Sequence, residues 1–485
     1  MDIFGNIIGA INSFIWGDLL VYLLILAGVW FTFRLRAIQF RHFSEVFRTL
    51  IRPRQDDPGG ISPFQAFCAS LAARIGTGNV AGVAVAIYLG GPGAVFWMWL
   101  VAALGMATAF AESTLAQAYK VRDSRGRYRG GPAFYIARGL KAPWAAVAFS
   151  FFLILAFGLV FNAVQANSIA DAMNAAFAIP HLWTAIAVTV CSALVIIGGI
   201  RGVARFSEVV VPVMAGAYLL AAIAAIAMNI SAVPGVLRLI VTSAFGFGPA
   251  AGGVAGGLMA AMMNGVKRGL FSNEAGMGSA PNIAATATPN PHHPCAQGFV
   301  QAFGVFVDTI LVCTATAMLI LLSGVLQPGS GVTGINLTQQ AMTVHFGAWG
   351  SPFVAIAILF FAFTSIAGNY AYAEGAMAYL RLDDGVSLAT LRLLLLAVVL
   401  WGGMSPVTTV FEVADLAMGL MSTINIVSIM LLSGVTARLA RDYIAQRRAG
   451  LEPRFDPAAH PELEGRVDLT VWAPEATPEP AARTA

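Results

Sequence analysis

The sequence predicts an all-α polytopic membrane protein with about eleven transmembrane helices, and three observations support this fold class. Hydrophobic residues make up 58% of the 485-residue chain and charged residues only 11%, whereas an ordinary globular domain has about 25% charged residues. The apolar residues form runs long enough to cross a bilayer. Two of these runs are interrupted by glycine-rich, polar segments. The net charge of only +4 gives no indication of nucleic-acid binding.

Eleven apolar stretches each have the length of a membrane-spanning helix, which is about 20 residues. They are residues 17–34, 62–90, 93–119, 144–174, 182–200, 207–229, 251–285, 298–324, 352–380, 388–403 and 407–435. The second and seventh stretches are longer than one crossing needs, and they contain the glycine-rich interruptions. We therefore expect both to be broken helices, in which an unwound segment separates two half-helices.

Arginine and lysine concentrate in every second connection between these spans, which predicts that those connections are cytoplasmic. The basic connections lie within residues 34–54, 120–141, 201–205, 381–392 and 438–454. With an odd number of spans, this pattern places the N-terminus outside and the C-terminus in the cytoplasm. We expect a multi-pass protein of the plasma (inner) membrane.

The spans divide into one peripheral helix and two halves of five spans each. The predicted regions are a peripheral helix with a basic loop (1–61), a first half (62–229), an outer interfacial linker (230–250), a second half (251–435) and a disordered, proline-rich cytoplasmic tail (436–485). Because five is odd, the halves have opposite orientations in the membrane. This predicts a five-plus-five inverted repeat whose first and sixth core helices are broken.

The two interruptions, residues 75–79 (IGTGN) and 271–278 (FSNEAGMG), predict a ligand site. Unwound backbone at membrane depth must be buried in protein or line a cavity. The N–H groups at the start of a half-helix suit a carboxylate, and freed carbonyls suit an ammonium group or a cation. An alternative is that the glycines only permit close helix packing. Asn79, Asn273 and Glu274, however, would be costly inside lipid without a partner.

Several motifs resemble the alanine or glycine:cation (sodium) symporter family. They are residues 69–83 (ASLAARIGTGNVAGV), 96–112 (FWMWLVAALGMATAFAE), 130–132 (GGP), 268–281 (RGLFSNEAGMGSAP) and 304–309 (GVFVDT). The match runs in order from about residue 60 to 435. The resemblance implies a leucine-transporter-type fold, within the amino acid-polyamine-cation superfamily, and neutral amino-acid uptake coupled to sodium.

We expect the substrate-binding residues to come from the breaks and from two neighbouring spans. They are Thr77, Gly78, Asn79, Gln165, Phe271, Ser272, Asn273, Gly276 and Asn369. The first break is expected to take the carboxylate and the second the ammonium group. Gln165 and Asn369 are expected to face the substrate side chain. At Asn369 the sequence departs from the family, in which a tryptophan is usual, so a widened pocket for serine or glutamine is a hypothesis beside alanine and glycine.

The resemblance also implies a sodium site, for which a hard cation needs oxygen ligands. The implied ligands are the backbone carbonyls of Ala72, Ile75 and Phe361 and the hydroxyls of Thr364 and Ser365. The alternative is that these hydroxyls only bond back to carbonyls of their own helix. We expect no cofactor other than the sodium ion.

Ionisable residues inside spans are functional candidates because their burial is expensive. They are Arg74, Glu112, Asp171, Lys267, Arg268, Glu274, Asp308, Glu374, Glu412 and Asp415. We expect Arg74 and Glu274 to form a gate or an ion pair at the breaks. Glu112, Asp308 and Glu374 are expected near the cytoplasmic third, paired with loop arginines or Lys267. The run 292–295 (HHPC) is interpreted as a solvated connector and not as a metal site.

The primary interpretation is a symporter that works by alternating access, with a neutral amino acid and sodium as partners, embedded in the lipid bilayer and favoured as a monomer. One alternative replaces sodium by a proton, with Glu274 or Glu112 titrating. A second alternative is a membrane amino-acid sensor, although the tail has too few apolar residues for a folded signalling domain. The spans contain no HExxH or GxSxG motif, so we do not expect an enzyme.

Overall fold

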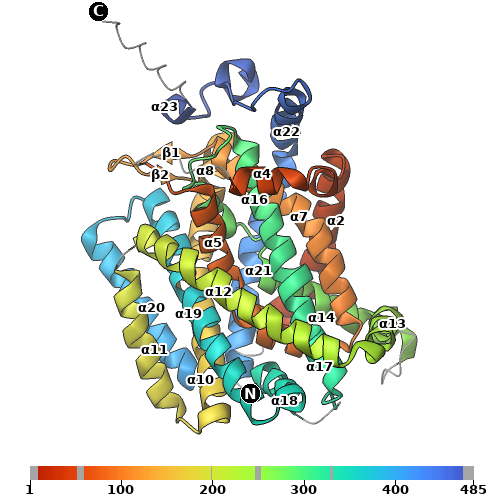
Figure 1. The fold of residues 1–485 in the computed structure, drawn as a ribbon. Coiled ribbons are helices and arrows are strands. Elements are labelled where there is room, and N and C mark those ends of the chain that lie inside the picture. Colours follow the sequence, from red (N-terminus) through yellow and green to blue (C-terminus); the bar gives the residue numbers. More distant parts are fainter. Residues whose placement is uncertain (1–8, 52–58, 198, 246–252, 328–330, 473–485) are drawn as a thin grey trace, which may run out of the picture.

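The computed structural model is a helical bundle with one short β-hairpin (Figure 1), and it describes residues 9–51, 59–197, 199–245, 253–327 and 331–472. Among these residues, eight helical runs are long and apolar enough to cross a membrane, and a bent helix pair makes a ninth. The all-α, polytopic class is thereby confirmed. The count of eleven crossings and the inverted repeat stay predictions.

In the first part of the chain the elements are η1 (Ser13–Leu20), α2 (Val21–Arg34), α3 (Ile38–Arg41), α4 (Ser44–Leu50), α5 (Pro63–Arg74), η2 (Gly78–Gly82), α6 (Val83–Gly90), α7 (Ala94–Ala118), β1 (Val121–Arg122), β2 (Tyr128–Arg129), α8 (Pro132–Gly139), α9 (Pro143–Leu153), η3 (Ile154–Val160), α10 (Phe161–Phe177), α11 (His181–Ile196) and α12 (Gly199–Met228). The elements labelled η are π- or 3₁₀-helical. The two strands pair antiparallel.

In the second part the elements are η4 (Ile230–Ala232), α13 (Val233–Ala244), α14 (Gly253–Asn273), α15 (Ala280–Ala284), α16 (Pro294–Val305), η5 (Phe306–Cys313), α17 (Thr314–Ser323), α18 (Gly334–Phe346), η6 (Gly347–Trp349), α19 (Gly350–Tyr379), α20 (Gly385–Met404), α21 (Val407–Leu431), α22 (Ser433–Arg448), η7 (Pro457–Ala459), η8 (Pro461–Leu463) and α23 (Leu469–Trp472). The hairpin, α22 and α23 lie at one end of the bundle, and α13 and α18 lie at the other (Figure 1).

The first break follows from how α5 begins and ends. Ser62 caps the helix: its hydroxyl accepts the N–H of Gln65 at 3.1 Å, and the Gln65 side chain accepts the N–H of Ser62 at 3.2 Å. The helix ends at Arg74, η2 begins at Gly78, and the two half-helices meet at an angle of 51°. The interruption therefore lies where the sequence predicts it.

The second break separates α14 from α15. Glu274, Gly276 and Gly278 all have positive φ, at 58°, 86° and 85°. This left-handed backbone cannot continue a right-handed helix, and glycine adopts it at little cost. Glu274 does so at a cost, which must be offset by its surroundings. This interruption too was predicted from the sequence.

Two helices lie outside the main spans. The helix α13 falls within the predicted linker, whose residues 246–250 lie outside the described ranges. By contrast, α18 was not predicted. Thr338 donates to the carbonyl of Val80 at 3.0 Å and Gln339 to that of Ala172 at 3.0 Å. The helix α18 thus packs on η2 and α10. Its mixed polar sequence does not predict this packing.

The prediction of a disordered tail is wrong for residues 436–472. After α22 the chain buries single large side chains, Phe455, Leu463 and Trp472, each at most 2% exposed. The Phe455 N–H donates to the carbonyl of His292 at 2.9 Å. Isolated apolar residues in a proline-rich sequence resemble a solvated segment, but here each one fills a site on the folded bundle. Residues 473–485 lie outside the described ranges.

The prediction of a solvated connector at residues 292–295 is also wrong. His293 is fully buried, and its Nε2 lies 3.2 Å from the Oδ2 of Asp442 in α22. Burial lowers the pKa of His293. Burial alone would raise the pKa of Asp442, but hydrogen bonds from His293, His460 and Gln446 hold that pKa below its usual range. No group of His, Cys, Asp or Glu in the described ranges has the arrangement of a metal site.

Replacing Phe455 by alanine is expected to release the segment after α22. A buried phenylalanine contributes about 3–5 kcal/mol, more than a short peripheral segment can lose and stay docked. We expect trypsin to cleave after Arg454 and Arg466 at least tenfold faster in F455A. Mass spectrometry of the released fragments measures this. Leu451→Ala is the control, because Leu451 is 60% exposed. Equal cleavage rates in both variants would contradict the docked arrangement.

Candidate functional site

The two breaks lie against each other in the centre of the bundle. A Cβ atom added to Gly78 would lie 2.9 Å from the Cα of Ser272 and 3.2 Å from the Phe271 ring. No side chain fits at that position without moving backbone. Gly78 begins η2, Ser272 and Asn273 end α14, and all three are buried, as the ends of interrupted helices at membrane depth must be. The structure thus brings the two predicted segments into one site.

Freed backbone in the first break is satisfied by two amide side chains. The Oε1 of Gln165 accepts the N–H of Thr77 at 3.0 Å and its hydroxyl at 2.8 Å. The Oδ1 of Asn79 accepts the N–H of Gly76 at 3.0 Å. The structure therefore joins Thr77 directly to Gln165, and Asn79 bonds to the adjacent residue Gly76.

Asp308 links the two breaks, and the sequence analysis placed it wrongly. It is fully buried, and its carboxylate accepts Asn79 Nδ2 at 2.7 Å, Ser272 Oγ at 2.8 Å and Thr309 Oγ1 at 2.7 Å. We had expected Asp308 in the cytoplasmic third beside Lys267 or loop arginines. Only its type, an acid inside an apolar span, marked it as functional. Asp308 lies in the π-helical segment η5, which hydropathy does not reveal.

The five residues implied as sodium ligands converge between α5 and α19. Ser365 Oγ lies 2.9 Å from the carbonyl oxygen of Ala72, 3.4 Å from that of Ile75 and 3.0 Å from that of Phe361. Thr364 Oγ1 lies 2.9 Å from the Phe361 oxygen and 3.4 Å from the Ala72 oxygen. Neutral carbonyl and hydroxyl oxygens in this arrangement suit a hard cation such as sodium. The donor set therefore fits the ion that the resemblance implies.

Three predicted substrate residues lie around the Thr77–Gln165 contact without touching it. Asn369 Nδ2 donates to Asn162 Oδ1 at 3.0 Å, one helical turn before Gln165. The ring of Phe271 stacks on that of Phe161 with 4.7 Å between centroids. The Oδ1 of Asn273 accepts the N–H of Ala275 at 3.0 Å, which closes the end of α14.

Gly276 is held from two other helices. Its N–H donates to Glu112 Oε1 at 3.2 Å, and its carbonyl accepts Asn425 Nδ2 at 2.9 Å. Asn425 also donates to the other oxygen of Glu112 at 2.9 Å. The structure does not bring Gly276 to Thr77 or Gln165. Glu112 binds the second break and not a loop arginine, so its expected pairing is wrong.

Arg74 and Glu274 form no direct ion pair in the described part of the chain. Glu274 accepts the hydroxyls of Ser279 at 2.5 Å and Tyr372 at 3.1 Å. Arg74 donates through Nη1 to the carbonyl of Gln301 at 3.3 Å, and its Nε and Nη2 are buried without a hydrogen-bond partner there. The expected pair is therefore wrong as a contact.

Glu374 behaves as predicted. Its Oε1 lies 3.0 Å from Nη2 of Arg129, in the basic connection after α7. This pair confirms the expected link between Glu374 and a loop arginine, and it ties α19 to the β-hairpin.

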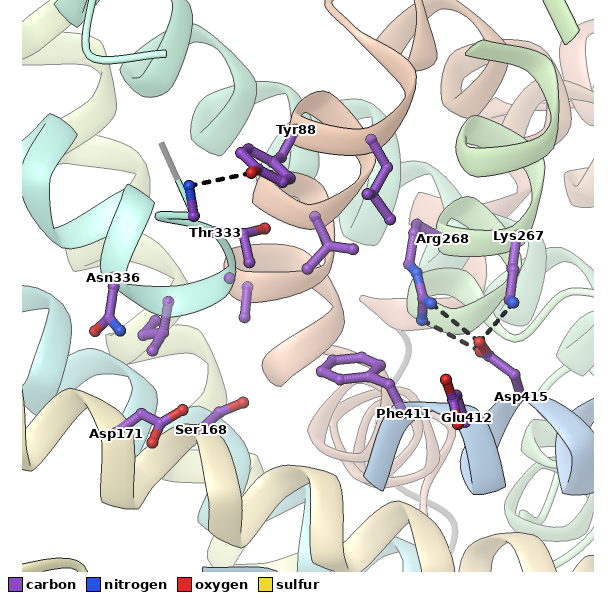
Figure 2. A pocket seen from close by; sticks show the side chains of 16 residues that line it. Tyr88, Ser168, Asp171, Lys267, Arg268, Thr333, Asn336, Phe411, Glu412 and Asp415 are labelled. Carbon is purple, nitrogen blue, oxygen red and sulfur yellow. Dashed lines mark hydrogen bonds and ion pairs between the residues drawn. The ribbon is translucent and has the colours of Figure 1, made fainter. Parts of the chain in front are cut away.

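A partly open pocket of about 470 Å³ lies at the α18 end of the bundle (Figure 2), and we call it the Arg268 pocket. It is lined by Ala81, Val85, Tyr88, Leu89, Ser168, Asp171, Lys267, Arg268, Gly331, Thr333, Gly334, Ile335, Asn336, Phe411, Glu412 and Asp415. Arg268 makes two contacts with the Asp415 carboxylate at 3.2 and 3.0 Å, and Lys267 Nζ lies 2.6 Å from the same group. These three charged side chains are functional candidates from the sequence, which does not predict their pairing.

Comparison with known proteins identifies a family of transporters. The model of the sodium:alanine symporter family matches residues 1–457. The amino-acid carrier protein AlsT of Bacillus subtilis is 47% identical over 461 residues, covering 95% of this chain and 97% of that protein. The probable sodium/glutamine symporter GlnT of the same organism is 46% identical over 455 residues, covering 94% of each.

Among solved structures, the manganese transporter of Eremococcus coleocola superposes with a TM-score of 0.51 at 13% identity, covering 81% of this chain and 88% of that one. At this identity the likeness concerns the fold alone. The matched family and the relatives consist of transporters. The prediction that this protein is not an enzyme is therefore confirmed. The chain is a multi-pass membrane protein that belongs to the sodium:alanine symporter family.

Proposed function

We propose that this protein couples sodium entry to the uptake of a small neutral amino acid by alternating access. The proposal rests on one observation: backbone carbonyl oxygens and a backbone N–H group lie close together in the first broken helix. The carbonyl oxygens of Ala72 and Ile75 lie beside the hydroxyl of Ser365, and the N–H of Thr77 follows two residues later. An ion bound by these oxygens orders the backbone that presents the Thr77 N–H.

This arrangement makes coupling a local property of the first break. Sodium at Ala72, Ile75, Phe361, Thr364 and Ser365 would fix the end of α5 against α19. The N–H groups of Thr77, Gly78 and Asn79, at the positive end of the next half-helix, would then be aligned for the substrate carboxylate, which would replace Gln165 as the acceptor of the Thr77 N–H. By linkage, each ligand raises the affinity of the other by the same factor.

For the rest of the substrate, we assign the carbonyls of Phe271, Ser272 and Asn273 to the ammonium group. Asp308 supports this assignment, because its side chain bonds directly to Ser272 and Asn79 and brings acidic oxygens beside the breaks. Gly276 stays assigned as a residue that shapes the second break.

Gln165 and Asn369 are assigned to the substrate side chain. Alanine and glycine are the first candidates, and serine and glutamine follow from the amide at Asn369. The name of the relative GlnT, a probable sodium/glutamine symporter, is consistent with a glutamine substrate. We further propose the plasma (inner) membrane as the location, with the C-terminus in the cytoplasm. This orientation rests on the distribution of arginine and lysine.

Purified protein in proteoliposomes is expected to accumulate labelled alanine only when an inward sodium gradient is imposed. The measurement is uptake in external sodium, potassium and choline buffers. Equal uptake in all three would contradict sodium coupling. A pH gradient imposed at fixed sodium separates the proton-coupled alternative, which requires uptake to follow that gradient. Binding of alanine without flux would instead support a sensor.

Ser365→Ala is expected to weaken sodium binding. Losing one buried oxygen ligand costs about 1–3 kcal/mol, so the sodium concentration for half-maximal uptake should rise about tenfold or more. The uptake rate at saturating sodium should change less. Thr423→Ala is the matched control, because Thr423 also bonds to a carbonyl of its own helix, Gly419, at 2.8 Å but lies in α21. Unchanged sodium dependence in S365A would contradict the proposed sodium site.

Asn369→Trp is expected to narrow the pocket and to remove its amide. Competition by glutamine and serine against labelled alanine should weaken about tenfold, while competition by glycine should change little. A panel of neutral L- and D-amino acids measures this, and a thermal unfolding assay verifies that the variant is folded. An unchanged profile in a folded N369W protein would show that Asn369 does not face the substrate.

A further inference from the structure

The two broken helices are fastened to each other at the hairpin end of the bundle. The N–H of Ile61, just before α5, donates to the carbonyl of Thr286 at 3.0 Å. The N–H of Thr288 donates back to the carbonyl of Ile61 at 2.9 Å. Thr286 and Thr288 lie in the connection between α15 and α16, residues 285–293. At this end α5 can therefore move away from that connection only if both hydrogen bonds break.

Lys120 strengthens this closure from the base of the hairpin. Its Nζ donates to the carbonyl of Ala287 at 2.8 Å, and the residue is 1% exposed. The ammonium group lies 4.0 Å from the ring centroid of Tyr128 and 5.1 Å from that of Trp472 in α23, which lies beside the hairpin (Figure 1). A buried ammonium group is costly without compensation, and the faces of aromatic rings supply it. Trp472 therefore helps to keep Lys120 bound to Ala287.

The segment after α22, residues 449–472, packs on the same connection, and we call it the docked tail. The N–H of Phe455 donates to the carbonyl of His292, which belongs to residues 285–293, at 2.9 Å. The ring centroids of His292 and Trp472 lie 4.9 Å apart, and those of Phe455 and Trp472 lie 5.1 Å apart. The docked tail thus supports the closure at two points, directly at His292 and indirectly through the ammonium group beside Trp472.

The docked tail is itself held by single side chains on the outside of the bundle. Besides Phe455 and Trp472, Leu463 is buried, and Nη1 of Arg466 donates to the carbonyl of Gly139 at 3.3 Å. A short segment held in this way opens more readily than the helices beneath it. The tail can therefore undock while the bundle stays folded. Its anchors also lie apart from the residues assigned to sodium and substrate.

We propose that the docked tail is an autoinhibitory latch that holds the two broken helices closed at this end of the bundle. This inference rests on the proposed function, since alternating access requires this end, cytoplasmic in the proposed orientation, to open in each cycle. Contacts that exist only in the closed arrangement favour it over the open one. Undocking of the tail therefore shifts the population towards the open arrangement, and α5 is the element released.

Native cysteines report whether α5 leaves its packing. Cys68 lies in α5 and is 1% exposed, and the exposed Cys191 is removed as C191S. In the full-length protein in nanodiscs, a maleimide should label Cys68 about tenfold faster in W472A and in F455A than in the C191S parent, since tail undocking frees α5. Mass spectrometry identifies the labelled residue. L469A is the control and should label at the parent rate, because Leu469 lies in α23 but is 65% exposed.

Thermal unfolding measures whether each variant is folded, and a folded variant decides the outcome, because W472A and F455A each loosen the tail. Labelling of Cys68 at the parent rate would overturn the latch, and so would equal acceleration in L469A. Unfolding of both variants would also overturn it, since the tail would then be part of the core. The sodium dependence of alanine uptake by the wild-type protein tests the proposed function separately. Accelerated labelling with sodium-independent uptake would contradict that function while supporting the latch.

Discussion

The structure depends on satisfying the backbone of two helix breaks where the bilayer offers no hydrogen bonds. Several freed groups near the breaks bond to side chains from elsewhere in the bundle. Gln165 in α10 accepts from Thr77, Glu112 in α7 accepts from Gly276, and Asn425 in α21 donates to Gly276. The helices that surround the breaks are thus part of the site. A movement of any of them changes which backbone groups are free for a ligand.

The two breaks act as one unit because they are in contact. The absence of a side chain at Gly78 lets η2 approach Ser272, and the Asp308 carboxylate bonds to a residue on each side of this contact. The hydrogen bonds that Asp308 accepts from Asn79 and Ser272 therefore hold the two segments in contact.

Features that leave a local pattern in the sequence could be predicted, whereas features that depend on distant contacts could not. The breaks could be predicted, because glycine and polar residues inside an apolar run conflict with a continuous helix within a few positions. The oxygen ligands came from family resemblance, and the structure brings all five together. Asp308 and Glu112 were misplaced because a span predicts depth only to within a turn or two. The docked tail and α18 were missed because their few apolar residues pack against distant elements, which no local pattern records.

Selectivity among amino acids must come from outside the breaks, since backbone groups bind only the carboxylate and ammonium common to all of them. Under the proposed function, Asn369 is the candidate residue for this selectivity. Its Nδ2 is used by Asn162, whereas its Oδ1 is buried and has no hydrogen-bond partner in the described ranges. A buried acceptor without a partner costs free energy, and a substrate that carries a hydroxyl or amide donor removes that cost. A tryptophan at this position would offer no such acceptor, so the departure from the family pattern favours a polar side chain.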